Sequence, residues 1–239
     1  MIIFYISILT LIASVIGTIT GFGISTIMIP VLAIFFPPIE AIFLVSIIHW
    51  FGNVWKIVLF RKGFNLRPLL LFGVTGFLTS YLGASISLGS NEEFLLRISG
   101  IFLFGYSLFL ILQTGFKVPA VNTTALLGRS LSGFFAGVFG IGGAIRSMFL
   151  SAFNLPKEVF IATAGAIGLL VDSTRIVTYF AGGAQLSKLL WWGLPFFVAI
   201  SFIGAKIARH IVDKIPQDKF RTVIAFFLLV VGTKLAIWP

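Results

Sequence analysis

Cysteine is absent from the sequence, which excludes disulfide bonds, thiolate metal sites and thiol chemistry. Charge is scarce as well: Asp, Glu, Lys and Arg make up 10% of the residues, whereas a soluble domain carries roughly 25%. Histidine occurs only twice, no HExxH motif is present and no serine–histidine–acid set is evident, so nothing points to an enzyme. We therefore predict a protein without catalytic residues, bound metal or cofactor.

Apolar residues dominate what is present. They make up 59% of the chain, the mean hydropathy is +1.12, and nearly every stretch between charge clusters is long enough for a helical span of about 20 residues. The sequence therefore predicts an all-α integral membrane protein whose residues 1–239 form a single membrane domain. The apolar residues 1–13 lack a basic n-region and a clear A-x-A site, which favours a retained helix over a cleaved signal peptide.

The net charge of +10 is concentrated in two short basic loops, at 61–67 and 209–221. In a soluble protein this charge would suggest nucleic acid, but in a membrane protein basic loops mark the cytoplasmic side. We expect membrane lipid, and no nucleic acid, as a partner. Counting spans back from 209–221 puts both ends of the segment 124–153 inside. This segment is therefore predicted to be a re-entrant hairpin or a pair of short crossings.

Ten helical segments are predicted, five in each half of the chain. A polar break at 113–124 separates a first repeat, 1–113, from a second repeat, 122–239. In each half, a helix hairpin broken at glycine precedes three full transmembrane helices. The expected ranges are 2–20, 24–36, 41–60, 69–88, 94–112, 124–139, 143–153, 158–180, 189–208 and 219–237.

The two halves also match at separated glycine and polar positions, as a duplication would. The matches at a spacing of 119 residues are Gly21-Phe22-Gly23 with Gly140-Ile141-Gly142, Asn53 with Asp172, and Lys56 with Arg175, and Leu82-Gly83-Ala84 matches Ile203-Gly204-Ala205. Because each half crosses the membrane an odd net number of times, the two repeats are expected to be inverted, with both termini outside. Inverted repeats with broken helices are typical of secondary transporters.

The two glycine turns are the centre of the predicted site. Backbone at membrane depth must be buried in protein or line a cavity, so we interpret each turn as a break in a helix; the alternative is that the glycines only allow close helix packing. The N–H groups that begin a returning half-helix lie at the positive end of its dipole and bind anions. The residues assigned to this role are Gly21, Phe22, Gly23, Ser25 and Thr26 in the first half, and Gly140, Gly142 and Gly143 in the second.

Charged side chains follow the second turn. Arg146 lies in the first turn of the returning segment, where a cation opposes the helix dipole. It would pair with an oxyanion, or else form an intramembrane salt bridge or snorkel. Asp172 and Arg175 share one helical face, either as a local ion pair or with Asp172 carrying a coupling proton.

Polar residues occupy the corresponding span of the first half. Asn53 is a predicted hydrogen-bond donor to the substrate. His49 lies one turn before it and could titrate near neutral pH, or could be a hydrogen-bonded packing residue. Lys56 is expected to extend toward Arg61 at the membrane surface.

The glycine-rich arms at 17–30 and 137–150 resemble those of the TauE/SafE permeases, the sulfite/organosulfonate exporter and toluene sulfonate uptake family. The resemblance covers essentially the whole chain. It implies a polytopic transporter of the plasma membrane that moves sulfur-containing anions such as sulfite, sulfoacetate and taurine. The first arm departs from the family, since Gly21-Phe22-Gly23-Ile24 has fewer consecutive glycines than is usual there.

The predicted function is secondary transport of a small sulfonate or sulfite by alternating access, with proton coupling as an option. A carrier of carboxylates or other small anions, or an anion channel, fits the same basic site. The exact substrate, the direction of transport, the coupling ion and a homodimeric assembly stay open.

Overall fold

The computed structural model describes residues 1–60, 63–112, 122–214 and 217–239, and all regular elements within these ranges are helices. Six of them are long and apolar enough to cross a membrane: α1 (Ile2–Ile19), α3 (Pro38–Leu59), α4 (Leu66–Leu88), α5 (Glu92–Leu112), α8 (Lys157–Ala181) and α9 (Lys188–Ile211). The others are α2 (Ser25–Leu32), α6 (Asn122–Phe139), α7 (Gly142–Leu150) with a 3-10 turn at Ser151–Phe153, and α10 (Gln217–Ile237). The all-helical membrane prediction is thus confirmed. Arg61, Lys62 and residues 113–121, on which the predicted orientation and repeat boundary partly depend, lie outside the described residues.

One helix break interrupts the apolar run in each half of the chain, and glycine explains both breaks. Beyond α1, Gly21 has a φ of +75° and Gly23 a φ of +84°, and beyond α6, Gly140 has a φ of +72°. An L-residue with a side chain rarely adopts these angles, so glycine ends the helix at little cost. The chain then turns in the same way twice. The Gly23 N–H donates to the Gly17 carbonyl at 2.9 Å, and the Ile141 N–H donates to the Phe135 carbonyl at 3.3 Å.

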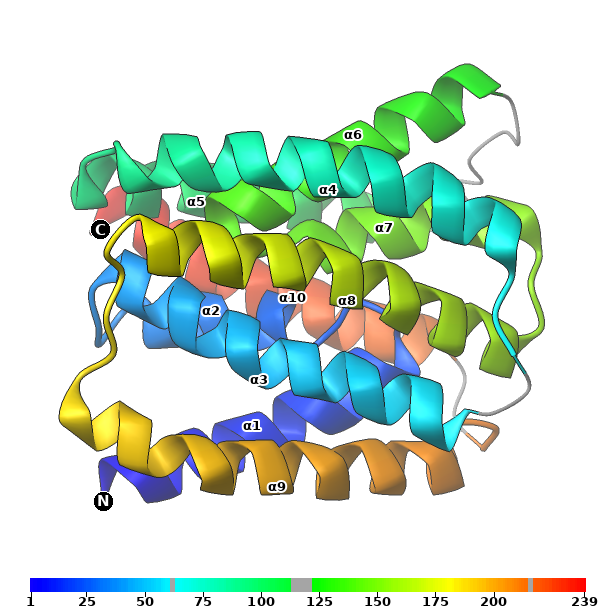
Figure 1. The fold of residues 1–239 in the computed structure, drawn as a ribbon, viewed down its shortest axis with the longest axis horizontal. Coiled ribbons are helices and arrows are strands. Elements are labelled where there is room, and N and C mark those ends of the chain that lie inside the picture. Colours follow the sequence, from blue (N-terminus) through cyan, green and yellow to red (C-terminus); the bar gives the residue numbers. More distant parts are fainter. Residues whose placement is uncertain (61–62, 113–121, 215–216) are drawn as a thin grey trace.

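Hydrogen bonds at the helix ends fix the directions of α3 and α8. Glu40, at the start of α3, accepts a hydrogen bond from the Ser187 N–H in the loop before α9. Lys157, at the start of α8, donates to the Val212 carbonyl just after α9. The two helices therefore begin at opposite ends of α9 and run antiparallel. Both chain termini lie at the end where α3 begins (Figure 1).

Packing between helices joins the two halves of the chain. α1 packs against α9, α6 against α4, α3 against α8, and α5 against α10. Small residues allow the close approaches: a Cβ added at Gly204 of α9 would lie 2.6 Å from the Ser14 Cβ of α1, and one added at Gly83 of α4 would lie 2.9 Å from the backbone nitrogen of Val138 in α6. The outer faces of α4 and α8 expose large apolar side chains such as Phe77, as a lipid-facing surface does.

Candidate functional site

A buried polar cluster lies where α3 crosses α8, and Asp172 is its centre. One carboxylate oxygen, Oδ1, accepts a hydrogen bond from Arg175 Nη1 at 2.8 Å. The other, Oδ2, accepts from Asn53 Nδ2 at 2.9 Å and lies 2.9 Å from His49 Nδ1. All four residues are at most 2% exposed, so these contacts form away from water. Asn53 and Asp172, which the sequence analysis matched across the two halves, thus touch each other directly.

Lys56 extends this cluster along α3. Its Nζ donates to Asn53 Oδ1 at 3.2 Å, and only 1% of the residue is exposed. The prediction that Lys56 reaches the membrane surface is therefore wrong. Glycines of α8 make room for the inward orientation, because a Cβ at Gly168 would lie 2.5 Å from Asn53 Nδ2 and one at Gly165 would lie 3.1 Å from Lys56 Cβ.

The two helix breaks lie against each other. Ser147 of α7 donates its hydroxyl to the Gly21 carbonyl at 2.5 Å. A Cβ at Gly143 would collide with the Phe22 carbonyl oxygen, so only glycine allows α7 to begin here. Within the first break, Thr26 also donates to the Phe22 carbonyl, at 2.9 Å. The backbone of each half therefore shapes the break in the other.

Both breaks also adjoin the polar cluster. A Cβ at Gly23 would collide with His49 Nε2, and one at Gly140 would lie 2.8 Å from Arg175 Nη2. Gly142 is held by Ser132, whose hydroxyl donates to its carbonyl at 3.0 Å, and Ser25 is 1% exposed at the start of α2. The predicted glycine turns and the predicted charged residues thus form one continuous buried region.

Arg146 lies in this region without enough partners. It is 2% exposed, and its Nε and Nη2 have no hydrogen-bond partner in the described part of the chain. The same holds for Nε and Nη2 of Arg175, whose Nη1 is bonded to Asp172. Guanidinium N–H groups that are buried unpaired carry a large desolvation cost.

The charges of the cluster do not balance. Among the described residues, the buried cations are Lys56, Arg146 and Arg175, and the one buried carboxylate is Asp172. A buried charge is costly unless an opposite charge compensates it, by several kcal/mol per ion in real proteins. This region of the membrane interior is therefore short of negative charge.

All thirteen residues assigned to the site from the sequence are buried in this region. The sequence also predicts a hydroxyl donor at Ser147, which the structure places at the first break, and it misplaces Lys56. It does not identify Tyr179, whose hydroxyl donates to the Gly137 carbonyl at 2.8 Å and so ties α8 to α6. Tyr179 lies one helical turn after Arg175, and that spacing is the signal that could have found it.

Comparison with known proteins agrees with this picture. The family model described as "Sulfite exporter TauE/SafE" matches residues 6–235 of the 239 in the chain. No curated protein matches the chain. The family is one of membrane transporters and not of enzymes. With several apolar helices long enough to cross a membrane, a buried cationic cluster and this match over nearly its whole length, the chain belongs to the TauE/SafE sulfite exporter family of multi-pass membrane transporters.

Proposed function

We propose that this protein is a secondary transporter that carries small sulfur oxyanions, sulfonates or sulfite, across the plasma membrane by alternating access. The observation that carries the proposal is the imbalance of the buried cluster, in which three cations accompany one carboxylate and two guanidinium groups retain unpaired N–H donors. A bound oxyanion would supply the missing negative charge and accept those hydrogen bonds.

The chemistry of the donors suits an oxyanion. Arg146 and Arg175 present planar N–H forks, which bind two oxygens of a carboxylate, phosphate or similar group at once. The half-helices α2 and α7 begin at the same region, and their free N–H groups add partial positive charge. We assign substrate contact to Arg146, to Arg175 and to the first N–H groups of α2 and α7. Asn53 is assigned as a neutral hydrogen-bond donor.

We further propose that residues 1–113 and 122–239 are inverted repeats of one transport domain, each with a re-entrant hairpin. Helices at equivalent places exchange partners: α1 pairs with α9 and α6 with α4, while α3 pairs with α8 and α5 with α10. A residue meets its own repeat equivalent only near a two-fold axis, and Asn53 contacts Asp172. An axis through the α3–α8 crossing would place the substrate at the midplane, as in other inverted-repeat transporters.

His49 is the residue to which we assign a coupling proton. Its Nδ1 lies 2.9 Å from Asp172, which also pairs with Arg175, and Lys56 and Arg146 are buried cations of the same region. An imidazolium here would repel those cations when no anion is bound and would be compensated when one is. Proton and anion would therefore bind together. In proteoliposomes, His49→Gln is expected to abolish uptake driven by a pH gradient while retaining substrate exchange; pH-driven uptake at the wild-type rate would remove the assignment.

Uptake of a labelled sulfonate into proteoliposomes tests the proposal as a whole. Arg146→Gln should lower uptake about 10- to 100-fold, because a hydrogen bond to a charged group is worth about 1.5–3 kcal/mol. The matched control is Arg97→Gln, which changes an exposed arginine paired with Glu93 at 2.8 Å and should leave uptake unchanged. Wild-type uptake by a folded Arg146→Gln protein would contradict the proposed site.

Two competing functions are separated by the same preparation. Thermal stabilisation by carboxylates but not by sulfonates would indicate a carboxylate carrier. Flux that neither saturates nor supports counterflow exchange would indicate a channel, since a channel needs no alternating gates.

A further inference from the structure

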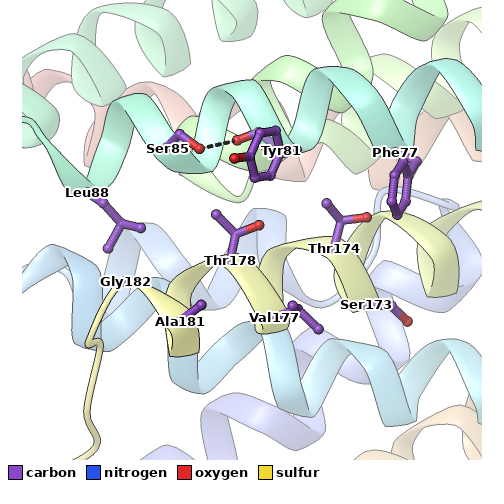
Figure 2. A pocket seen from close by; sticks show the side chains of 10 residues that line it. All are labelled: Phe77, Tyr81, Ser85, Leu88, Ser173, Thr174, Val177, Thr178, Ala181 and Gly182. Atoms are coloured by element: carbon purple, nitrogen blue, oxygen red, sulfur yellow. Dashed lines mark hydrogen bonds between the residues drawn. The ribbon is translucent and has the colours of Figure 1, made fainter.

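A groove of about 550 Å³ runs between α4 and α8 (Figure 2). It lies toward the ends of these helices that are on the side of the chain termini (Figure 1). Its lining is uncharged, and half of its residues carry hydroxyl groups: Tyr81 and Ser85 from α4, and Ser173, Thr174 and Thr178 from α8. Three of these hydroxyls, those of Ser85, Ser173 and Thr174, donate to carbonyls of their own helix. The proposed substrate contacts do not use any of these side chains.

The groove and the buried cluster share α8. Ser173 and Thr174 line it and are the two residues between Asp172 and Arg175. From there the lining follows α8 toward Ala181 and Gly182, near the end of that helix. One wall of the groove therefore belongs to the same stretch of α8 as the charged residues.

The repeat supplies a counterpart for comparison. At the spacing of 119 residues, Thr174 of α8 corresponds to Trp55 of α3. At the spacing of 121 residues defined by Leu82-Gly83-Ala84 and Ile203-Gly204-Ala205, Tyr81 of α4 corresponds to Phe202 of α9. The α3–α9 junction is thus the repeat equivalent of the α4–α8 junction.

The two junctions differ in packing. At the α3–α9 junction, the Trp55 indole donates to Ser201 Oγ at 3.1 Å and packs edge-on against Phe202, with ring centroids 5.2 Å apart. At the α4–α8 junction, the equivalent Thr174 and Tyr81 face a groove. A bridge of aromatic side chains on one side therefore corresponds to an open, hydroxyl-lined space on the other.

We infer that the α4–α8 groove is the outer vestibule through which the anion reaches the cluster, and that the Trp55–Phe202 contact closes the equivalent route on the cytoplasmic side. This inference rests on the proposed function. Because the hydroxyls of Ser85, Ser173 and Thr174 donate to helix carbonyls, their oxygens offer lone pairs to water, so the groove can hold a hydrated anion without binding it tightly. Because the lining of the groove is uncharged, the anion is attracted only by the positive cluster. Transport then requires the Trp55–Phe202 contact to open so that the anion can leave on the other side.

The absence of native cysteine allows a direct test with single-cysteine variants. Thr178→Cys lies in the groove, and its counterpart Leu59→Cys on α3 is also partly buried. The probe is a membrane-impermeant methanethiosulfonate that carries a sulfonate, applied in aqueous solution to both faces of the protein in proteoliposomes. We expect Thr178→Cys to react, to lose transport on reaction and to be protected by methanesulfonate, whereas Leu59→Cys stays unreactive.

Removing the aromatic contact should reverse this pattern. The double variants are Leu59→Cys/Trp55→Ala and Leu59→Cys/Phe202→Ala. In each, the thiol introduced by Leu59→Cys should react about tenfold faster, because losing one aromatic pair raises the population of the state with an open α3–α9 junction by about that factor. Two separate variants keep the test valid if one of them does not fold. A rate unchanged in both folded variants would overturn the role of this contact.

An acyl chain is the competing occupant of the groove. If Thr178→Cys reacts with a lipid-soluble maleimide but not with the aqueous probe, the groove holds lipid and the inference fails. Aqueous labelling that neither blocks transport nor is slowed by any carried anion also overturns it. Protection by a carboxylate but not by methanesulfonate would support the groove as the vestibule and contradict the proposed substrate. Failure of this inference can therefore be told apart from failure of the proposed function.

Discussion

The α3–α8 and α5–α10 junctions each pair helices from corresponding places in the two halves of the chain, yet their contents are opposite. At α3–α8 the helices bury Asp172, Asn53, Lys56 and Arg175, and Arg146 of α7 is buried in the same region. At α5–α10 they enclose Leu103, Leu228 and Leu235, with Gly100 against the backbone of α10. Apolar packing alone joins helices well enough in a membrane, and buried charge is expensive there. The charged α3–α8 junction therefore marks the proposed substrate site, whereas the apolar α5–α10 junction serves only to hold the helices together.

The largest effect is expected from Asp172→Asn. This change removes the carboxylate that compensates Arg175 and leaves the buried cations facing one another, and breaking a buried ion pair from one side costs about 3–5 kcal/mol. The Tm of the purified protein should fall markedly, and added methanesulfonate should restore part of the loss by supplying negative charge. A Tm equal to that of the wild type would mean that the junction does not depend on charge compensation.

A smaller, purely structural loss is expected from Gly100→Ala at the apolar junction. The added Cβ would lie 2.6 Å from the Leu235 carbonyl carbon, and such overpacking costs about 1–3 kcal/mol. The affinity of the folded fraction for the anion should not change. Gly105→Ala is the matched control on the same helix, because a Cβ there meets nothing within 4 Å. Weaker anion binding by the folded Gly100→Ala protein would mean that the α5–α10 junction also affects the substrate site. It would contradict the distinction drawn between the two junctions.

The glycine break beside the cluster should combine both kinds of effect. Gly140→Ala forces an L-residue into a φ of +72°, at about 1–2 kcal/mol, and pushes a methyl group into the Ile29 side chain and toward Arg175 Nη2. We expect a lower Tm together with a several-fold higher KM for transport. Gly183→Ala isolates the backbone strain, since Gly183 has a φ of +86° and open space around it. Equal KM values for the two variants would exclude an influence of the break on Arg175.

The smallest effect is expected from Trp50→Phe, which removes the hydrogen bond from the indole to Ser173 Oγ across the α3–α8 junction. A neutral hydrogen bond contributes about 0.5–1.5 kcal/mol, so the Tm should fall slightly and transport should continue. Loss of transport at full stability would instead assign Trp50 to the substrate path. Differential scanning fluorimetry alongside proteoliposome uptake distinguishes these results.

The sequence was sufficient for the helices and their breaks because both depend on local properties. Apolar length defined the spans, and Gly21, Gly23 and Gly140 marked where the backbone adopts positive φ. Asp172 and Arg175 were identified because charge within an apolar span is rare. The spacing of residues on one helix also placed Asp172 and Arg175 on a common face.

The contacts between helices could not be predicted in the same way. Lys56 was expected at the membrane surface because a long lysine side chain can reach it, but Gly165 and Gly168 on the neighbouring helix leave room for it to turn inward. The contacts of Trp55 with Ser201 and of Ser147 with Gly21 depend on which helices pack together. The spacing of residues along one helix does not show which other helix it will pack against.

Equilibrium binding of radiolabelled methanesulfonate to the purified protein tests most directly whether the excess positive charge at the α3–α8 crossing holds the anion. The wild type and Arg97→Gln should bind it saturably at one site per chain, and Arg146→Gln and Arg175→Gln should each lose that binding while remaining folded. Wild-type affinity in both folded cluster variants would contradict the account.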